Sequence, residues 1–408
     1  MDVERAVDDS ISTARRRTQA LRAGAAAAVL AVLGVVALLS MPKPLQLVPS
    51  ASRGTGSVRL YYEAAFPAPG DEPLHRPVSV AVMRGRVIVA DSVAGVVRVF
   101  DEHGVPESVV GSGALAAPTY VACDSSSGRV YVTDRKLGAL FAFDLGSTEA
   151  SRVEPRWPVS SRGTTSSTEA TSWSPLGAAV GPGGSVWVTD VSARHRVLEL
   201  DPLGRVVREV GGPGSESPVV VVLEYPNDVA FVDSEVWVSD SNHGRVVVFD
   251  LQGRYLRAMS LRGLVRGIVA IPGASGEATA VAGVDALGHE IVLWDIEGAE
   301  LGRFGEPGTT AGRLQFPNDV AVSADGTRLF VVDTGNRRVQ VWRIEWADGE
   351  VSSQRPAGVD AANRAPYVAA AVVALAAALG LAVVAASLWR LQRAAEAERG
   401  DAGPSVLQ

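Results

Sequence analysis

Cysteine, lysine and an excess of positive charge are what this sequence has least of. The single cysteine, Cys123, excludes an internal disulfide framework. Only Lys43 and Lys136 are lysines among 38 basic residues, a bias towards arginine that is typical of GC-rich bacterial genomes. The net charge is −7, so the composition gives no reason to expect a nucleic acid partner.

The usual signatures of catalysis and cofactor binding are also missing. The chain has no GxSxG nucleophile elbow and no phosphate-binding loop. No two histidines have the spacing of metal ligands; they are His75, His103, His195, His243 and His289. We therefore expect no cofactor. The 47% of hydrophobic and 20% of charged residues nevertheless predict a folded chain.

Two long uncharged segments predict membrane anchoring. Residues 23–42 and 365–389 contain no charged side chain, and each is long enough to span about 30 Å of hydrocarbon as a helix. Arginines precede the first segment and follow the second, so the positive-inside rule predicts that both termini are cytoplasmic. The residues between the spans would then lie outside the cytoplasm, at the cell membrane.

Each predicted span has an alternative interpretation. The first could be a cleaved signal peptide, although its charged lead is long and no clear small-x-small cleavage site follows it. The second could be a buried core helix, which is unusual for 25 uncharged residues at the end of a β-rich chain. With uncleaved spans the chain divides into seven segments: a cytoplasmic segment (1–22), a span (23–42), a linker (43–56), a repeat domain (57–346), a linker (347–364), a span (365–389) and a cytoplasmic tail (390–408).

An internal repeat fills residues 57–346. The pattern V-x-V-x-D, or a close variant, recurs six times at intervals of 43 to 56 residues; its last residues are Asp91, Asp134, Asp190, Asp240, Asp285 (weakened) and Asp333. Each unit has four short apolar runs separated by turn residues, which predicts one four-stranded antiparallel sheet per unit. Six such sheets around an axis form an all-β, six-bladed β-propeller.

The ends of the repeat predict how the ring closes. The sixth unit stops after its third apolar run, and an extra run, SVRLYYEAAF at 57–66, precedes the first unit. This run is expected to supply the outer strand of the sixth blade.

Two of the units resemble a known family. Residues 316–342 (FPNDVAVSADGTRLFVVDTGNRRVQVW) and residues 225–253 resemble NHL repeats, the first three units less closely and the fifth poorly. The resemblance implies a propeller that serves as a binding platform. It also implies kinship with six-bladed lactonases and lyases, some of which hold a divalent ion. A fold does not define a function, so both implications stay open.

The candidate ligand-binding residues lie where the innermost strands begin. The PND motif of the fourth and sixth units supplies Asn227, Asp228, Asn318 and Asp319, and the fifth unit between them contributes Arg266. These side chains are expected to meet at one mouth of the central channel. They could form a structural network in which both aspartates neutralise Arg266, a metal site with oxygen ligands, or an anion pocket centred on Arg266.

The aspartates that end the second strands favour a structural interpretation, because they recur in nearly every unit. They are expected to accept hydrogen bonds from the loop that follows. Their expected partners are the arginines that recur after that loop: Arg98, Arg196, Arg245 and Arg338.

The sequence as a whole favours a membrane-anchored, extracytoplasmic propeller that binds a protein or small ligand at the channel mouth without catalysis. The alternative is a metal-dependent, lactonase- or lyase-like enzyme. Either way, the mouth residues are expected to point away from the membrane.

Overall fold

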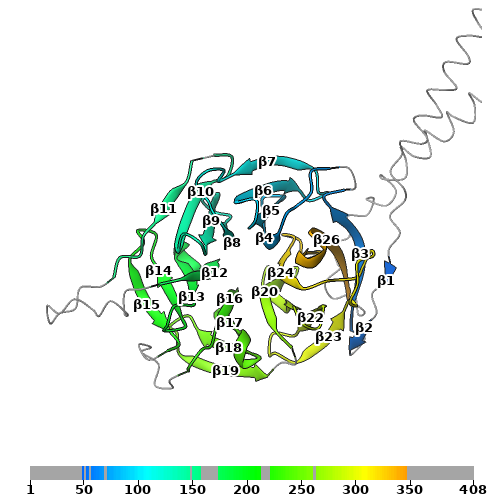
Figure 1. The fold of residues 1–408 in the computed structure, drawn as a ribbon. Helices are drawn as coiled ribbons and strands as arrows, with labels where there is room; N and C mark the ends of the chain where they lie inside the picture. Colours follow the sequence, from blue (N-terminus) through cyan, green and yellow to red (C-terminus); the bar gives the residue numbers. More distant parts are fainter. Residues whose placement is uncertain are drawn as a thin grey trace, which may run out of the picture. The chain divides into compact units, whose positions relative to one another are not determined.

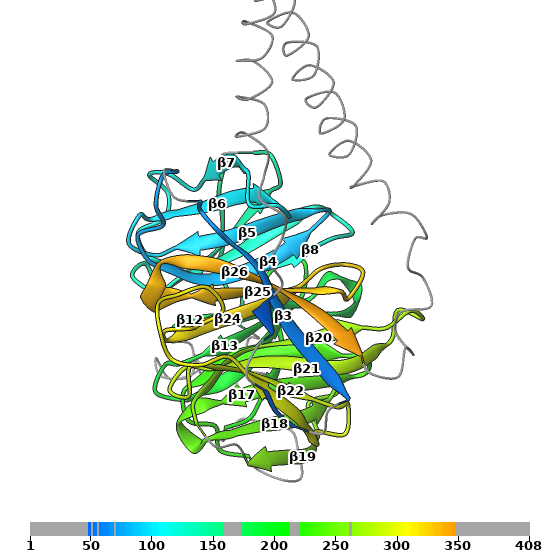
Figure 2. The ribbon, with the colours of Figure 1, turned by 90° about the vertical axis from the view of Figure 1, so that its right-hand side faces the viewer.

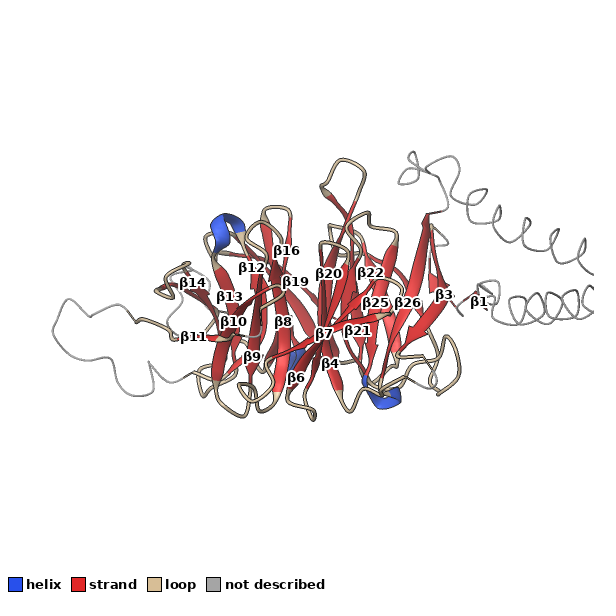
Figure 3. Cartoon of the chain, turned by 90° about the horizontal axis from the view of Figure 1, so that it is seen from above, coloured by secondary structure: helices blue, strands red, loops and turns tan. Residues whose placement is uncertain are grey.

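The structure is a ring of six antiparallel sheets, or blades, around a central axis (Figure 1). It is a computed structural model that describes residues 48–49, 52–54, 57–68, 71–147, 149–157, 173–212, 221–260 and 263–346. These residues are almost all strands and connecting turns (Figure 3). No helix in these ranges is long and apolar enough to cross a bilayer, and the two predicted spans lie outside them.

The first three blades follow one another along the chain. Blade one contains β4 (Pro77–Met83), β5 (Arg86–Asp91), β6 (Val96–Asp101) and β7 (Pro106–Val110). Blade two contains β8 (Pro118–Asp124), β9 (Arg129–Asp134), β10 (Ala139–Asp144) and β11 (Ser151–Val153). Blade three contains β12 (Pro175–Val180), β13 (Val186–Asp190), β14 (Arg196–Leu200) and β15 (Val206–Val210), with the 3-10 turn η1 (Pro182–Gly184).

The last three blades complete the ring. Blade four contains β16 (Pro226–Val232), β17 (Glu235–Asp240), β18 (Arg245–Asp250) and β19 (Tyr255–Ser260), with the 3-10 turn η2 (Ser241–His243). Blade five contains β20 (Val265–Pro272), β21 (Ala278–Asp285), β22 (Glu290–Trp294) and β23 (Glu300–Phe304). Blade six contains β24 (Pro317–Val322), β25 (Arg328–Asp333), β26 (Arg338–Trp346) and β3 (Val58–Phe66), with the 3-10 turn η3 (Thr334–Asn336).

The strand β3 closes the ring as the sequence predicted. It pairs antiparallel with β26 over eight residue pairs, from Val58↔Trp346 to Phe66↔Val339 (Figure 2). Leu60 is 2% exposed and packs into the core between blades five and six. Because Val58 and Trp346 are paired, the chain enters and leaves the propeller at the same edge of blade six.

The segment 43–56, expected to be only a linker, contains two short strands. Strand β1 (Val48–Pro49) pairs with β3, and strand β2 (Ser52–Gly54) pairs with β23. The sheets of blades six and five therefore have five strands each. Backbone pairing at two outer edges ties this part of the chain to the propeller, which composition alone did not indicate.

The second strands of the blades are buried along most of their length, because each is covered by a neighbouring blade on both sides. This explains their continuous apolar character and the fully buried Trp187 and Trp237. The aspartate that ends each second strand accepts a backbone N–H from the segment just before the innermost strand; the donors include Arg76, Ala117, Ser174, Glu224, Leu264 and Gln315.

The predicted arginine partners of these aspartates are confirmed. Arg196, Arg245 and Arg338 each place Nε within 2.8 Å of the aspartate of their own blade, and Arg98 lies 3.4 Å from Asp91. The aspartates also accept hydrogen bonds from the loop that follows, as expected; the donors include Leu137 and Ser192. These residues therefore fasten the entry segment and the following loop of each blade to the end of its second strand.

Candidate functional site at the channel mouth

The innermost strands all begin at one end of the channel, called here the mouth face. In each blade, the first residue of this strand pairs with the aspartate of the second strand, and a β-bulge follows at once. The residues two positions after the first residue of each innermost strand are Ser79, Tyr120, Gly177, Asp228, Gly267 and Asp319. Several of them meet across the ring and form a hydrogen-bonded layer, called here the plug.

Asp319 ties three blades together within the plug. Its Oδ2 accepts from Ser79 Oγ at 2.6 Å and from the Val80 N–H at 3.0 Å, both in blade one. Its Oδ1 accepts from Tyr120 Oη in blade two at 2.9 Å. At 1% exposure, the Asp319 carboxyl is committed to these contacts and does not face solvent.

Asp228 occupies the corresponding position in blade four. Its Oδ2 accepts from the Ile268 N–H of blade five at 2.8 Å, and its Oδ1 accepts from the Val229 N–H at 2.7 Å. The Tyr120 hydroxyl interacts with Asp228 as well as with Asp319, so it lies between the two carboxyls. The two PND aspartates are thus interior bonding groups of the ring.

Two blades contribute glycine to the plug because nothing larger fits. A Cβ on Gly267 would lie 2.2 Å from Asp319 Oδ1, and one on Gly177 would lie 2.3 Å from the Asn227 carbonyl oxygen. Neither glycine has a positive φ, so close approach of neighbouring groups explains both.

Burial changes the acidity of the plug. It raises the pKa of Asp319 from 3.8 to about 6, and it raises the pKa of Asp228 well above 3.8 with a further contribution from the nearby Asp319. The pKa of Tyr120 is raised by its burial and by the two carboxyls. Burial in the plug therefore shifts both carboxyl groups towards their protonated, uncharged form.

Arg266 is not neutralised by Asp228 and Asp319, so the expected structural ion-pair network is wrong. Within the described part of the chain Arg266 forms no ion pair; its Nη1 donates to Asn318 Oδ1, and its buried Nε has no hydrogen-bond partner. Burial lowers the pKa of Arg266, and the neighbouring Arg76 lowers it further. The aspartates face inward because their backbone partners lie there, which leaves the guanidinium above them.

The two asparagines belong to the same outer layer as Arg266. Asn318 Nδ2 donates to the Val78 carbonyl at 2.5 Å, which fixes the amide oxygen that meets Arg266. Asn227 donates only a long bond of 3.4 Å to the Tyr225 carbonyl. The five predicted residues therefore separate into two layers, the aspartates in the plug and the asparagines with Arg266 at the surface.

Two aromatic residues that the sequence reasoning did not single out flank this surface. Tyr225 and Phe316 immediately precede the two PN pairs, and both have a left-handed backbone, with φ of 56° and 49°. Each backbone N–H donates to a histidine Nδ1 of the preceding blade, His195 at 3.4 Å and His289 at 2.8 Å. Such backbones are strained for aromatic residues and cluster at functional sites. In the sequence, the repeated YPN or FPN motif was the signal that could have identified these two aromatic residues.

The mouth face also concentrates arginines that lack a carboxylate partner. Most arginines in the described ranges form ion pairs, whereas the structure gives none for Arg76, Arg135, Arg266 and Arg337 on this face. Arg135 instead lies over the Tyr225 ring, 5.6 Å from its centroid. Phe316 is 52% exposed, so aromatic and cationic groups are both accessible. The outer layer is suited to an anionic group next to a flat apolar one.

The arrangement offers little to a metal ion. In the ranges that the structure describes, no three or more His, Cys, Asp or Glu side chains group so as to hold one. Asp228 and Asp319 are the two carboxylates among the predicted site residues. Both are occupied by hydrogen-bond donors, and protonation would remove their negative charge.

The NHL-repeat family model matches residues 173–200, which contain the first three strands of blade three. The structure is a six-bladed β-propeller, and one unit of it matches the NHL-repeat model. The resemblance identified in residues 225–253 and 316–342 thus extends to a third unit. No characterised protein matches this propeller significantly by sequence.

Solved structures share the fold of this NHL propeller. A gluconolactonase from Xanthomonas campestris superposes with a TM-score of 0.53 at 17% identity, covering 74% of this chain and 99% of the other. An auxiliary nutrient binding protein from Bacteroides thetaiotaomicron gives 0.51 at 12% identity, covering 67% and 70%. A streptogramin B lyase gives 0.47 at 15% identity, covering 71% and 98%. At such identities the likeness concerns the fold alone.

Proposed function

We propose that this propeller is a binding module that holds an anionic group, such as a carboxylate or phosphate, of a protein or small-molecule partner at the mouth face. The observation that carries the proposal is Arg266. Its guanidinium is largely buried, has an Nε without a partner and meets no carboxylate within the described residues. A buried cation without a counter-charge is unfavourable, and an anionic ligand would relieve that cost.

The groups around Arg266 fit such a ligand. Arginine recognises carboxylates and phosphates through two parallel N–H donors. Asn318 holds the guanidinium from one side, and Arg76 adds positive charge close by. Tyr225 and Phe316 would cover an apolar part of the same ligand. This proposal refines the anion-pocket interpretation of Asn227, Asp228, Arg266, Asn318 and Asp319, and it assigns the two aspartates a supporting role beneath the pocket.

We further propose that the propeller is anchored to a bacterial cell membrane and faces away from the cytoplasm. The support is the arginine distribution around residues 23–42 and 365–389. The alternative, a metal-dependent lactonase- or lyase-like enzyme, would need Asp228 and Asp319 as free ligands. Their buried hydrogen bonds and raised pKa values favour the binding module instead.

Phosphate titration of the full-length protein tests the mouth-face proposal. Arg266→Ala should weaken phosphate binding at least tenfold, measured by calorimetry, while thermal stability stays close to that of the parent because no ion pair is broken. Arg59→Ala, an exposed arginine on the outer strand of blade six, is the matched control and should bind normally.

Unchanged phosphate affinity in the Arg266→Ala variant would refute the anion site. Gain of Ca²⁺ binding in the same variant would favour the metal-site interpretation, because removal of the guanidinium would then have removed a repulsive charge.

A further inference from the structure

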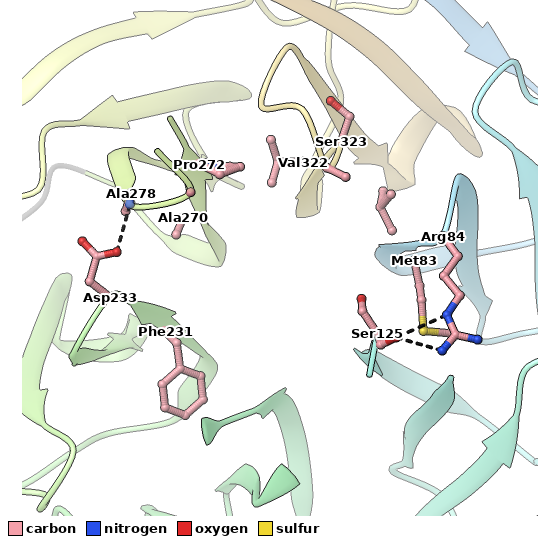
Figure 4. Close-up of a pocket in the computed structure, with 13 residues that line it drawn as sticks. Met83, Arg84, Ser125, Phe231, Asp233, Ala270, Pro272, Ala278, Val322 and Ser323 are labelled. Carbon is pink, nitrogen blue, oxygen red and sulfur yellow. Dashed lines mark hydrogen bonds between the residues drawn. The ribbon is translucent and has the colours of Figure 1, made fainter. Parts of the chain in front are cut away.

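A cavity opens on the opposite face of the ring, where the innermost strands end. Its outer part has a volume of about 440 Å³ and its inner part about 320 Å³. Val82, Phe231, Ala270 and Val322 line both parts, which therefore form one continuous shaft. Figure 4 shows the labelled side chains around the open space at the wide end. Sites for small molecules have volumes of roughly 300–1,000 Å³.

The wall of this shaft consists of open sheet edges. Each innermost strand is the end strand of its sheet, so within the described ranges no strand pairs with its axial side. Near the plug, some backbone N–H groups on that side are engaged by plug side chains: Val80 donates to Asp319, and Ile268 donates to Asp228. In an antiparallel pair, the backbone groups that face one side recur at every second residue. The next groups on the axial side therefore belong to residues two positions further along.

These residues form a ring of backbone donors and acceptors around the shaft. The N–H groups that plug side chains accept belong to Val80, Val121, Val229, Ile268 and Val320. Two positions further along the same strands lie Val82, Cys123, Phe231, Ala270 and Val322, all half-buried and all lining the inner part of the shaft. Their N–H and C=O groups face the axis beyond the reach of the plug. An unpaired sheet edge of this kind gains from a partner that both donates and accepts hydrogen bonds.

The shaft is polar but offers no partner to a charged group. Asp228 of the plug lines its inner end, where backbone N–H groups already engage the carboxyl. Burial raises the pKa of the Cys123 thiol to about 12, so this side chain is uncharged at neutral pH. At the rim, backbone groups engage both Arg84 and Asp233. A charged group inside the shaft would therefore lose its hydration without gaining a counter-charge.

One aromatic side chain interrupts the symmetry of the wall. Phe231 occupies the position that valine, cysteine or alanine takes in the other five blades. Its ring packs edge-on against Trp187, with 5.6 Å between the centroids, and it remains only half-buried. Because Phe231 lines both parts of the shaft, a ligand there would gain from covering it with a C–H surface.

We propose that the opposite-face shaft binds an uncharged polyhydroxylated molecule, a sugar or a cyclitol. Hydroxyl groups both donate and accept, so they match an edge that presents N–H and C=O groups together. The C–H face of the ligand ring would cover Phe231. An extended peptide would also match such edges, but the plug closes the inner end, so a charged peptide terminus would lie there without a counter-charge. This site is separate from the mouth-face anion site, because the plug lies between them.

Saturation-transfer NMR on the full-length protein in lipid nanodiscs tests the proposal. The neutral probes are glucose, galactose and myo-inositol, and their charged counterparts are glucuronate, galacturonate and inositol 1-phosphate. The neutral probe that binds most tightly should bind at least tenfold more tightly than its charged counterpart, because the shaft supplies hydrogen bonds but no counter-charge. A capped trialanine peptide, which has no charged terminus, tests the peptide alternative.

Variants locate the binding site. Ala270→Trp should weaken binding of the neutral probe at least tenfold by filling the shaft, and Val322→Trp should do the same from blade six. Val93→Trp places the same side chain at an exposed position of the mouth face and is the matched control. Melting curves check that each variant folds. Arg266→Ala should bind the neutral probe normally, so failure of the mouth-face proposal would not affect this one.

Four results would overturn the inference. They are no binding of any neutral probe, equal binding of the charged counterparts, binding of the capped peptide alone, and undiminished binding in both folded tryptophan variants.

Discussion

The asparagine and the aspartate of the repeated PND motif have different structural roles. In each copy the asparagine stays at the mouth surface, while the aspartate turns into the ring and bonds the next blade. The β-bulge explains the split, because the asparagine is its unpaired residue and the aspartate is the next residue that pairs with the second strand. A ligand at the mouth face could therefore contact Asn227, Asn318 and Arg266. The two aspartates of the plug lie beneath these residues and support them.

The raised pKa values of the plug predict that stability falls with rising pH. A carboxyl whose pKa is higher in the folded state binds its proton more tightly there. Its contribution to the unfolding free energy is fully present below the unfolded-state pKa of 3.8. That contribution is lost as the pH rises through the folded-state pKa, which is about 6 for Asp319 and is also raised for Asp228. Denaturant unfolding at pH 5 and pH 8 should show this loss.

Replacement of Asp228 by Asn should flatten that dependence. The amide cannot ionise, so the unfolding free energy of the variant should change less between pH 5 and pH 8 than that of the parent. Asp144→Asn, in which the replaced side chain is 73% exposed, serves as the control and should leave the pH dependence unchanged. If Asp228→Asn destabilises the protein at pH 8 as much as at pH 5, the plug is charged rather than neutral.

Gly267 provides a steric test of the plug. Gly267→Ala should destabilise the protein by roughly 2–4 kcal/mol, because the new Cβ would overlap Asp319. Gly113→Ala is the comparison: its Cβ meets nothing within 4 Å, so it bears only the left-handed backbone cost of about 1–2 kcal/mol. Equal unfolding free energies for the two variants would mean that the plug is loosely packed.

Among the elements, β3 decides whether the ring closes. It joins its blade from the far end of the repeat, and without it β26 would expose an unpaired edge. Its outer pairing with β1 shows that closure continues into the segment before the repeat. Closure in this propeller therefore depends on residues far apart in sequence.

Leu60→Ala should measure what β3 contributes. Leu60 is almost fully buried, so its truncation should cost about 2–4 kcal/mol of unfolding free energy. Arg59→Ala, on the exposed side of the same strand, should cost less than about 0.5 kcal/mol. Deletion of residues 57–66 should cause aggregation. A deletion variant that melts like the parent would show that β3 is dispensable.

At the scale of the whole molecule, the two faces of the propeller differ in chemistry. The mouth face is closed by the plug and has aromatic rings and arginines for which the described residues supply no ion pair, while a cavity opens on the opposite face. Both ends of the propeller, Val58 and Trp346, lie at the edge where β3 begins and β26 ends. With the expected membrane anchors, the mouth face would point away from the bilayer.

Reporter fusions and labelling test that orientation. Fusions at residues 2 and 408 should report the cytoplasm, and a fusion at residue 200 should report the outside. In a Cys123→Ser background, Val93→Cys on the mouth face should react with a bulky impermeant maleimide faster than Leu203→Cys on the opposite face. The parent residues are 65% and 64% exposed, so intrinsic accessibility is matched. A cytoplasmic signal from residue 200 would overturn the topology.

The sequence by itself determined the blades, because their evidence is local. Period-two apolar runs, turn residues and the recurring aspartate are encoded within each unit, and the missing fourth strand of the sixth unit pointed to residues 57–66. It also placed Asn227, Asp228, Arg266, Asn318 and Asp319 at one mouth, since equivalent positions of a repeat must lie on one ring.

Only the tertiary structure decided which of these residues contact each other. Whether Asp319 meets Arg266 or Tyr120 depends on the bulges, which turn neighbouring side chains into different layers. The cavity along the axis likewise arises only when six innermost strands converge. Contacts across the ring join residues as distant in sequence as Ser79 and Asp319, 240 positions apart, and no local pattern specifies them.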